Sequence, residues 1–347
     1  MVEPIRWGIL STANIGRAAV IPALEAADGA EVLAVASRDQ ERAETFAAAN
    51  GISRAHGSYE ALLADPEIDA VYIPLPNRLH AEWTLRAAGA GKHILCEKPL
   101  AVNAAECEAM SAAAEAAGVV LTEAFMYRFH PRTKRVLELL RGGVIGEPRT
   151  VRSAFTFRLR DPDNIRLSAE LGGGALMDVG CYCVNASRTL TGAEPVAAQA
   201  SARWTDGAPG LGVDDELTGV LHFPGGVTAH FDCALTQERW EFYEVAGTEG
   251  VLRVDSAFLP GTDDVTAVVH RGRDREEHPV AGDDEYRLMV EHFTACVRDG
   301  TTPRWPPAEA AANMRAIEAL YRSARNGGGA VPVAPPAASR SGEGGSI

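Results

Sequence analysis

The sequence predicts an α/β protein in two parts, an N-terminal doubly wound parallel sheet and a C-terminal α+β part with an open, mostly antiparallel sheet. The chain has 347 residues, enough for two hydrophobic cores. Apolar segments alternate with helical segments up to about residue 125, whereas β-branched segments joined by turns follow from about residue 147. We expect domains over 1–125 and 126–325. Glycine, proline, alanine and serine predict a flexible tail over 326–347.

Composition and charge exclude several classes of partner. The formal net charge is -14, and no Lys/Arg stripe interleaved with aromatic residues offsets it, so we expect no nucleic acid. No apolar run approaches the roughly 20 residues of a membrane helix, and the N-terminus lacks the regions of a signal peptide, which predicts a cytoplasmic protein without membrane contact. The six cysteines show no zinc-binding spacing. We expect buried, reduced thiols and no metal.

The first strand and turn indicate a dinucleotide site. An apolar strand over Ile5–Leu10 leads into Ser11, Thr12, Ala13, Asn14, Ile15 and Gly16, and then into an alanine-rich helix. A G-x-G-x-x-G turn would place pyrophosphate at the helix N-terminus, and Ser11 and Ala13 stand here for two of the glycines. Both are small, so close approach of a diphosphate stays feasible. The alternative is a plain strand-helix turn.

The end of the second strand favours NADP over NAD. The strand over Glu31–Ala36 ends in Ser37 and Arg38, where an NAD-binding protein carries an acid for the ribose 2′-hydroxyl. A hydroxyl beside a guanidinium suits a 2′-phosphate, because the planar fork can bind the dianion or stack on adenine. In the alternative, Arg38 is solvated and Asp39 supplies a delayed ribose contact.

A proline-containing loop follows the strand over Asp69–Ile73. Leu75, Pro76, Asn77 and His80 are candidates for the cofactor loop, since proline would hold it rigidly over a ligand. The alternatives are that Asn77 caps the helix over 81–90 and that His80 is a buried packing residue.

The next strand ends in residues suited to chemistry. The apolar run that begins at His93 stops at Glu97, Lys98 and Pro99, and a parallel sheet binds ligands beyond the carboxyl ends of its strands. Pro99 biases Lys98 toward an extended conformation, which aims the ammonium; the sequence leaves open whether the Lys98-Pro99 bond is cis. In the alternative, Lys98 is solvated and Glu97 is its surface partner.

The second half reads as a sheet with one helix of interest. Strands are expected over 150–158, 216–223, 227–234, 241–246 and 251–254. An open sheet leaves one face uncovered, which predicts a homo-oligomer, a dimer or a tetramer, through that sheet. A helical run opens with Gly172–Gly174, which permit close approach to another surface.

That helix carries Asp178 and Tyr182 four residues apart, so both can face one pocket. A phenol and a carboxylate facing Lys98 form a plausible proton-transfer set, in which the lysine would lower the tyrosine pKa toward working pH. In the alternative, Asp178 pairs locally and Tyr182 packs in the domain interface.

Together these residues resemble the Gfo/Idh/MocA oxidoreductase family. The resemblance covers about residues 4–325 and rests on Glu97-Lys98-Pro99, on the run from Tyr127 to Pro131, and on the three glycines with Asp178-x-Gly180-x-Tyr182. It implies a Rossmann domain that binds NAD(P) and an α/β domain whose open sheet forms oligomer contacts. The tyrosine form resembles the branch with NADP-dependent D-xylose dehydrogenases, dimeric dihydrodiol dehydrogenases and glucose-fructose oxidoreductase.

The resemblance also implies residue roles. Lys98 would bind and polarise the reacting oxygen, Tyr182 would exchange its proton, Asp178 would orient the substrate or the tyrosine, and Arg128 would lie near the nicotinamide. We expect an NADP-dependent dehydrogenase of an aldose at C1 or of a cyclic diol; the alternatives are NADPH-dependent reduction of a ketosugar and a non-catalytic NADP-binding regulator. Phe155, Phe157 and Arg160 are candidates for the pocket wall.

Overall fold

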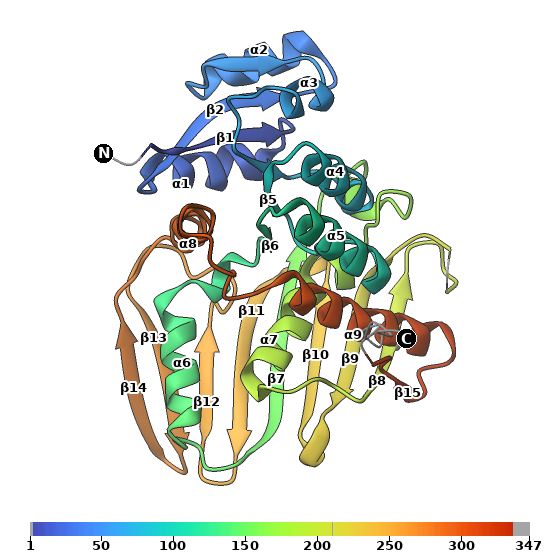
Figure 1. The fold of residues 1–347 in the computed structure, drawn as a ribbon. Helices are drawn as coiled ribbons and strands as arrows, with labels where there is room; N and C mark the ends of the chain where they lie inside the picture. The colour runs from blue at the N-terminus through green and yellow to red at the C-terminus, as the bar shows by residue number, and fades with distance from the viewer. Residues whose placement is uncertain (1–2, 210, 336–347) are drawn as a thin grey trace, which may run out of the picture.

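The computed structural model describes residues 3–209 and 211–335, which form two sheets with helices around them (Figure 1). The first sheet has the strand order β3-β2-β1-β4-β5-β6, and every pairing in it is parallel. Its strands are β1 (Ile5–Leu10), β2 (Ala30–Ala36), β3 (Arg54–His56), β4 (Ala70–Ile73), β5 (His93–Cys96) and β6 (Leu121–Glu123). The predicted doubly wound parallel sheet is confirmed.

Helices connect these strands. They are η1 (Gly16–Val20) with α1 (Ile21–Ala26), α2 (Gln40–Ala49), α3 (Tyr59–Leu63), α4 (Asn77–Gly89) and α5 (Ala104–Ala117). The four residues of β4 are all fully buried, because helices cover both faces of such a sheet. The strand order reverses between β1 and β4, which places a ligand crevice at their carboxyl ends.

The second sheet has nine strands in the order β14-β13-β12-β11-β7-β10-β9-β8-β15. They are β7 (Pro148–Arg158), β8 (Ala197–Trp204), β9 (Asp214–His222), β10 (Thr228–Ala234), β11 (Thr236–Gly247), β12 (Val251–Asp255), β13 (Val265–Arg271), β14 (Asp274–Val280) and β15 (Val331–Pro332). All pairings are antiparallel except β7 with β10. The predicted open, mostly antiparallel sheet is confirmed.

One face of this sheet is covered by helices (Figure 1). They include α6 (Pro131–Arg141), α7 (Cys181–Thr191) and α9 (Pro307–Arg325), while α8 (Glu285–Asp299) lies between the sheets; short helical turns are η2 (Met126–Arg128), η3 (Ile165–Leu167), η4 (Leu176–Gly180) and η5 (Pro224–Gly226). Phe231 and Cys233 on β10 point to the covered face and are buried, whereas His230 and Asp232, which alternate with them, are exposed. The other face is therefore open in the single chain.

Several sequence-based expectations need correction. The strands over 197–204, 265–271 and 274–280 and the helix α6 were not expected. An alanine-rich stretch hides the first strand and a polar stretch the third, whereas the β-branched strand over 265–271 and the amphipathic α6 carry a pattern that the prediction missed. The tail expected to be flexible from residue 326 includes Val331–Pro332, which pairs with β8, and Val333 donates its N–H to Val196 O at 3.0 Å. The prediction is wrong for this paired part; residues 336–347 lie outside the described residues.

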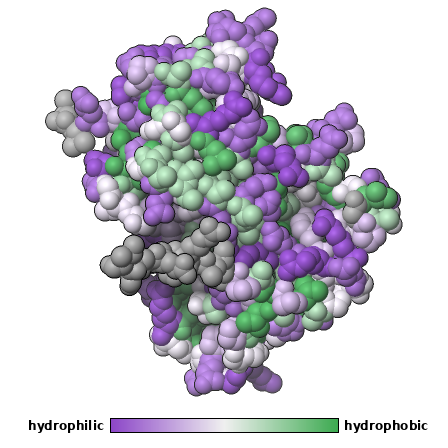
Figure 2. Space-filling view, turned by 45° about the vertical axis from the view of Figure 1, so that its right-hand side comes forward, coloured by the Kyte–Doolittle hydropathy of each residue, from purple (hydrophilic) through white to green (hydrophobic). Residues whose placement is uncertain are grey.

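The surface is mostly hydrophilic on the face drawn in Figure 2, with hydrophobic residues between the charged ones. Large exposed apolar side chains among the described residues are scattered, at Leu85, Ile165, Val196, Leu211 and Trp240. All six cysteines are buried and free, as expected. Among the described residues no helix is long and apolar enough to cross a membrane.

Candidate active site

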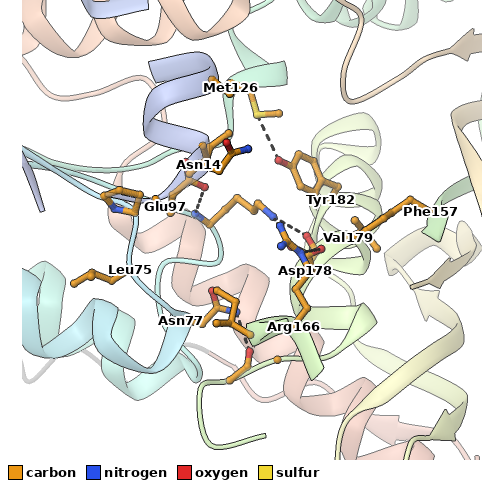
Figure 3. A pocket seen from close by; sticks show the side chains of 18 of the residues that line it. Asn14, Leu75, Asn77, Glu97, Met126, Phe157, Arg166, Asp178, Val179 and Tyr182 are labelled. Carbon is orange, nitrogen blue, oxygen red and sulfur yellow. Dashed lines mark hydrogen bonds and ion pairs between the residues drawn. The ribbon is translucent and has the colours of Figure 1, made fainter. Parts of the chain in front are cut away.

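A cavity of about 620 Å³ lies where the carboxyl ends of β1, β4 and β5 meet the second sheet (Figure 3). One side comes from the first sheet and its loops, the other from β7, η4, α7 and the loops around them. Its wall consists of Ala13, Asn14, Ile15, Ala18, Pro74, Leu75, Asn77, Glu97, Lys98, Met126, Phe155, Phe157, Ile165, Arg166, Leu171, Gly172, Gly173, Asp178, Val179, Tyr182, Arg239, Leu259 and Tyr286. The three predicted catalytic residues share this one space.

Lys98 lies at the centre of the cavity, directly beyond β5. Its peptide bond to Pro99 is cis, the point that the sequence left open. The ammonium donates to the backbone carbonyl of Asp178 at 2.8 Å and to Asp178 Oδ1 at 3.2 Å, and the side chain is 14% exposed. Burial works against the charge, but Asp178 and Cys181 outweigh it, and the pKa of Lys98 is raised. Lys98 is therefore cationic and aimed at the cavity.

Asp178 is held by two cations. Its Oδ2 accepts from Arg166 Nε at 2.6 Å, while its Oδ1 faces Lys98. Burial raises the pKa of this carboxyl, but Lys98 and Arg166 together overcome that effect, so its pKa stays below the ordinary value. The result is an ionised carboxylate at the cavity wall.

The three glycines before η4 explain how this helix reaches the cavity. Gly173 packs against the chain at Arg166, since an added Cβ would lie 2.3 Å from the Arg166 carbonyl oxygen. Gly174 has φ of 122°, and an added Cβ would lie 2.2 Å from Asp214 Oδ1. Asp214 in turn accepts from the N–H of Leu176 at 2.7 Å, at the start of η4. The prediction of close approach is confirmed, and these are the surfaces approached.

Arg166 was missed in the sequence. It lies in the irregular connection between β7 and η4, on the short turn η3, where no periodicity points to it. Arg160, the arginine expected at the pocket wall, does not line the cavity, whereas Phe155 and Phe157 do. The signal available in the sequence was that Arg166 lies in a polar segment that ends in Gly172–Gly174.

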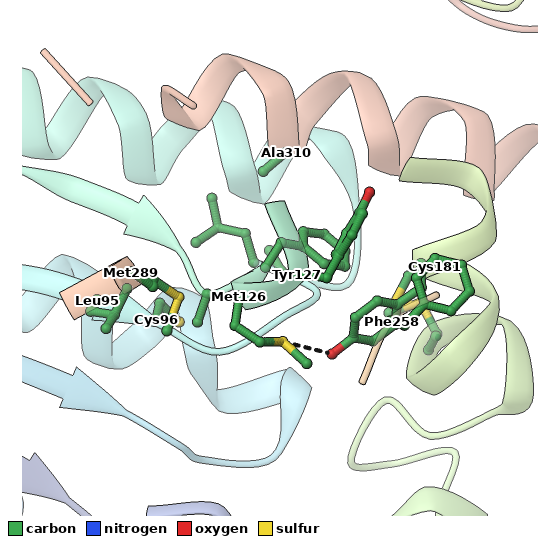
Figure 4. Close-up of a cluster of buried hydrophobic side chains, with 14 of the residues drawn as sticks. Leu95, Cys96, Met126, Tyr127, Cys181, Phe258, Met289 and Ala310 are labelled. Atoms are coloured by element: carbon green, nitrogen blue, oxygen red, sulfur yellow. Dashed lines mark hydrogen bonds between the residues drawn. The ribbon is translucent and has the colours of Figure 1, made fainter. Parts of the chain in front are cut away.

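Tyr182 lies one turn beyond Asp178, as their spacing predicted, and is 4% exposed. Rings of Phe125, Tyr127, Phe155 and Phe258 surround it with centroids 5.0–5.9 Å away. Figure 4 labels Tyr127, Phe258 and Met126 of this buried cluster. Its hydroxyl donates to Met126 Sδ at 3.4 Å, and Lys98 Nζ lies 5.0 Å from the ring centroid.

The expectation that Lys98 lowers the pKa of Tyr182 is wrong. Burial, with Tyr286 and Glu97 nearby, raises the pKa of Tyr182 well above its ordinary value of 10. The aromatic neighbours desolvate the hydroxyl, while the Lys98 ammonium forms its ion pair with Asp178 and not with Tyr182. The phenol therefore keeps its proton at neutral pH.

Glu97 forms the floor of the cavity beside Lys98. It accepts from Tyr72 Oη at 2.6 Å and from the N–H of Lys98 at 3.2 Å. Burial raises its pKa above the ordinary value, against the opposing effects of Lys98 and Tyr72. Glu97 is not a solvated surface partner of the lysine; it fixes the backbone that carries it.

The turn after β1 fits a dinucleotide. Ala13, Asn14 and Ile15 line the cavity, and a helix starts here, so its first N–H groups face outward without intrahelical partners. Ser11 takes φ of 153°, a conformation that glycine favours; its hydroxyl accepts from Ala13 N–H at 3.1 Å and donates to Pro74 O at 3.1 Å. Serine therefore builds the turn by hydrogen bonding where glycine would do so by conformational freedom.

A second hollow begins at Thr12 on this turn and is lined by two arginines, Arg17 and Arg42, and by the carboxylates of Asp39 and Glu41. Thr12 and Arg42 line it, and Arg42 Nε donates to Thr12 Oγ1 at 2.7 Å. Asp39 accepts from the N–H of Arg42 at 2.7 Å and caps α2, and it also lines this hollow. Ser37 is buried and Arg38 exposed at the strand end. Arg42 was missed, although its spacing of four residues from Arg38 was a signal.

Of the proline loop, Leu75 and Asn77 line the cavity, whereas Pro76 only precedes α4. Asn77 does not cap that helix with its side chain; its amide donates to Gly172 O at 2.8 Å and so joins the two halves of the wall. His80 is fully buried outside the cavity wall, with ring nitrogens 2.9 Å from Pro99 O and 2.8 Å from Leu75 O. It positions both loops.

Arg128, which the resemblance places near the nicotinamide, is not part of the cavity wall. It is buried, donates from Nε to Asn185 Oδ1 at 2.7 Å, and lies 4.3 Å over the Trp305 ring. Met126, two residues earlier, lines the cavity instead. Contacts with α7 and with the segment just before α9 hold the guanidinium at this place.

Two family models match the chain. The model of the GFO/IDH/MocA oxidoreductase family, described as an NAD-binding Rossmann fold, matches residues 5–125, and that of the GFO/IDH/MocA C-terminal domain matches 133–253. A D-xylose 1-dehydrogenase (NADP(+)) of Haloferax volcanii is 44% identical, covering 92% of this chain and 98% of its own. A trans-1,2-dihydrobenzene-1,2-diol dehydrogenase of Mus musculus is 35% identical, covering 88% and 92%.

Solved structures agree over nearly the whole length. A 3-ketoreductase from Actinomadura kijaniata, in complex with NADP and TDP-benzene, has a TM-score of 0.88 at 34% identity and covers 93% of this chain and 98% of its own. An aldose-aldose oxidoreductase from Caulobacter crescentus, complexed with glycerol, has a TM-score of 0.87 at 32% identity and covers 95% and 100%.

Proposed function

The chain belongs to the GFO/IDH/MocA oxidoreductase family, and from this premise we propose that it is an NADP-dependent dehydrogenase acting on a hydroxyl of a sugar or cyclic diol. One observation carries the proposal. Lys98, Asp178 and Tyr182 share a cavity with Ala13–Ile15 of the turn after β1, and Thr12 of the same turn lines a second hollow together with Arg42. Proton-handling groups thus lie beside a dinucleotide-binding turn.

An aldose oxidised at its anomeric carbon is the proposed substrate. The relative of highest identity given above is a D-xylose dehydrogenase that uses NADP(+), and two further relatives act on a diol or between aldoses, as their names state. The cavity wall offers cations and a carboxylate for hydroxyl groups and Phe155 and Phe157 for the apolar face of a ring.

The mechanism divides the work between cofactor and protein. NADP supplies the carbon that accepts the hydride when the substrate C–H bond breaks. Lys98 holds the substrate oxygen with its ammonium, which Asp178 keeps charged and aimed. In the direction of reduction Tyr182 Oη donates its proton to the substrate oxygen, and in the direction of oxidation Tyr182 takes the hydroxyl proton after it has given its own proton to solvent. Glu97 and His80 fix the backbone around the lysine.

Lys98→Ala tests these roles. General acid-base and positioning groups of this kind contribute about 10²–10⁴-fold, so kcat for D-xylose oxidation should fall by that factor. The NADPH dissociation constant, measured by fluorescence titration, should stay within a few-fold of wild type. Full turnover in the variant would refute the assignment.

Reduction of a ketosugar by NADPH is the second candidate. The observation that favours it is the high pKa of Tyr182, because a protonated phenol is ready to donate to a carbonyl oxygen. The structurally similar 3-ketoreductase is in accord with this direction. Initial rates in both directions with the same sugar pair separate the two candidates.

The proposed domains are residues 1–125 and 126–325. We also propose that the chain forms a homo-oligomer through the open face of the second sheet. The face carries Trp240, 57% exposed, beside Phe242 two residues on, flanked by charged and polar side chains. Light scattering of wild type and Trp240→Glu tests the interface: a monomeric variant of an oligomeric protein supports it, and unchanged mass contradicts it.

A further inference from the structure

Arg166 presents its guanidinium to the cavity beside the Lys98–Asp178 pair (Figure 3). Arg166 Nε donates to one oxygen of the Asp178 carboxylate at 2.6 Å, and Lys98 Nζ donates to the other at 3.2 Å. One carboxylate is thus shared by two cations. The carboxylate sets their spacing, and the group of three keeps one net positive charge.

The terminal nitrogens of Arg166 keep donors for a ligand. Nη1 reaches Asn164 Oδ1 only at 3.4 Å, and Nη2 makes no hydrogen bond or ion pair with any residue of 3–209 or 211–335. The side chain is 39% exposed, and it lines the cavity. A guanidinium carries five N–H donors in a planar fork, of which Asp178 takes one.

The backbone under this side chain is fixed, which distinguishes Arg166 from a loose surface arginine. Its carbonyl accepts from Gly174 N–H at 2.9 Å, and its N–H donates to Asn164 Oδ1 at 3.1 Å. Gly173 packs closely against Arg166, because an added Cβ would lie 2.3 Å from the same carbonyl oxygen. The glycine run that precedes Asp178 therefore also sets the position of Arg166.

We propose that Arg166 contacts the substrate and binds the hydroxyl on the carbon next to the reacting carbon. The inference rests on the proposed function, in which Lys98 holds the reacting oxygen. Because Lys98 and Arg166 flank a single carboxylate, the substrate oxygens that they bind are close neighbours, as oxygens on adjacent carbons are. The substrate class is then a compound with vicinal oxygens, an aldose or a cyclic 1,2-diol, and an isolated alcohol is a poor substrate.

The test combines a change in the substrate with a change in the protein. D-xylose and 2-deoxy-D-xylose are oxidised by wild type, Arg166→Gln and Arg166→Lys, and kcat/KM is measured for each. Wild type should prefer D-xylose by about 10- to 100-fold, the range for a hydrogen bond to a charged group. Arg166→Gln should lose that preference, mostly because kcat/KM for D-xylose falls, and Arg166→Lys should keep part of it. Arg160→Gln, at an exposed site outside the cavity wall, should keep all of it.

A merely structural role of Arg166 gives a different result, because a disturbed site slows both sugars equally and leaves the preference intact. That outcome overturns the inference, and so does a wild-type enzyme that does not distinguish the two sugars. In both cases the oxidation of D-xylose by wild type still supports the proposed function. If neither sugar nor trans-cyclohexane-1,2-diol is oxidised with NADP, the proposed function fails and the inference fails with it.

Discussion

Replacing Asp178 by asparagine removes the one anion between two cations and leaves the shape of the side chain intact. Lys98 Nζ and Asp178 Oδ1 are 3.2 Å apart, so at an effective dielectric constant of about 20 their attraction is about 5 kcal/mol before desolvation is counted. Breaking a buried pair by removing one partner typically costs about 3–5 kcal/mol of stability. The amide oxygen still accepts one hydrogen bond, so we expect the free energy of unfolding, measured in urea at pH 7, to fall by about 3 kcal/mol.

The activity should fall as well, by about 10²-fold in kcat, because Lys98 is no longer held in place. In wild type the pKa of Lys98 is raised despite burial, by Asp178 first and then Cys181. Without the carboxylate, burial prevails and that pKa falls. The working ammonium is then lost as pH rises, and the variant should show an alkaline decline of kcat/KM that wild type lacks.

The sign of the stability effect follows from the lowered pKa of Asp178 in the folded state. Its stabilisation is complete above the ordinary carboxyl pKa of about 4 and is lost as pH falls through the lower folded value. Wild type and Asp178→Asn should therefore converge in stability only at acid pH. The exposed Asp163→Asn serves as the matched control. If Asp178→Asn keeps an activity within twofold of wild type, with an unchanged pH profile, the reasoning is refuted.

Three further outcomes are expected. Because the pKa of Tyr182 is raised, tyrosinate absorbance of wild type and Tyr182→Phe should coincide up to pH 10; a titration confined to wild type below that pH would contradict it. Arg42→Ala should weaken NADPH binding by roughly 10-fold and leave NADH unchanged in fluorescence titrations, and equal losses would exclude a 2′-phosphate contact. Gly174→Ala should cost about 3 kcal/mol or more in urea unfolding, since its Cβ meets Asp214 at positive φ, whereas Gly89→Ala, with open space around it, should change stability by less than about 1 kcal/mol.

The sequence by itself determined the parts of the site that local chemistry encodes. Lys98 follows a short apolar run that ends at a proline, which predicts a buried strand whose end meets the ligand edge of a parallel sheet. Asp178 and Tyr182 share a face because four residues make about one helical turn. Ser11 and Ala13 kept the dinucleotide turn because a small side chain leaves the close approach open.

Only the tertiary structure decided which distant groups meet these residues. Arg166 reaches Asp178 from an irregular connection without periodicity, and Arg128 is drawn to Asn185 and Trp305 by packing against helices far along the chain. The pKa of Tyr182 went the opposite way from the sequence-based expectation for the same reason. Desolvation depends on every element that surrounds a group, whereas the sequence shows only its neighbours along the chain.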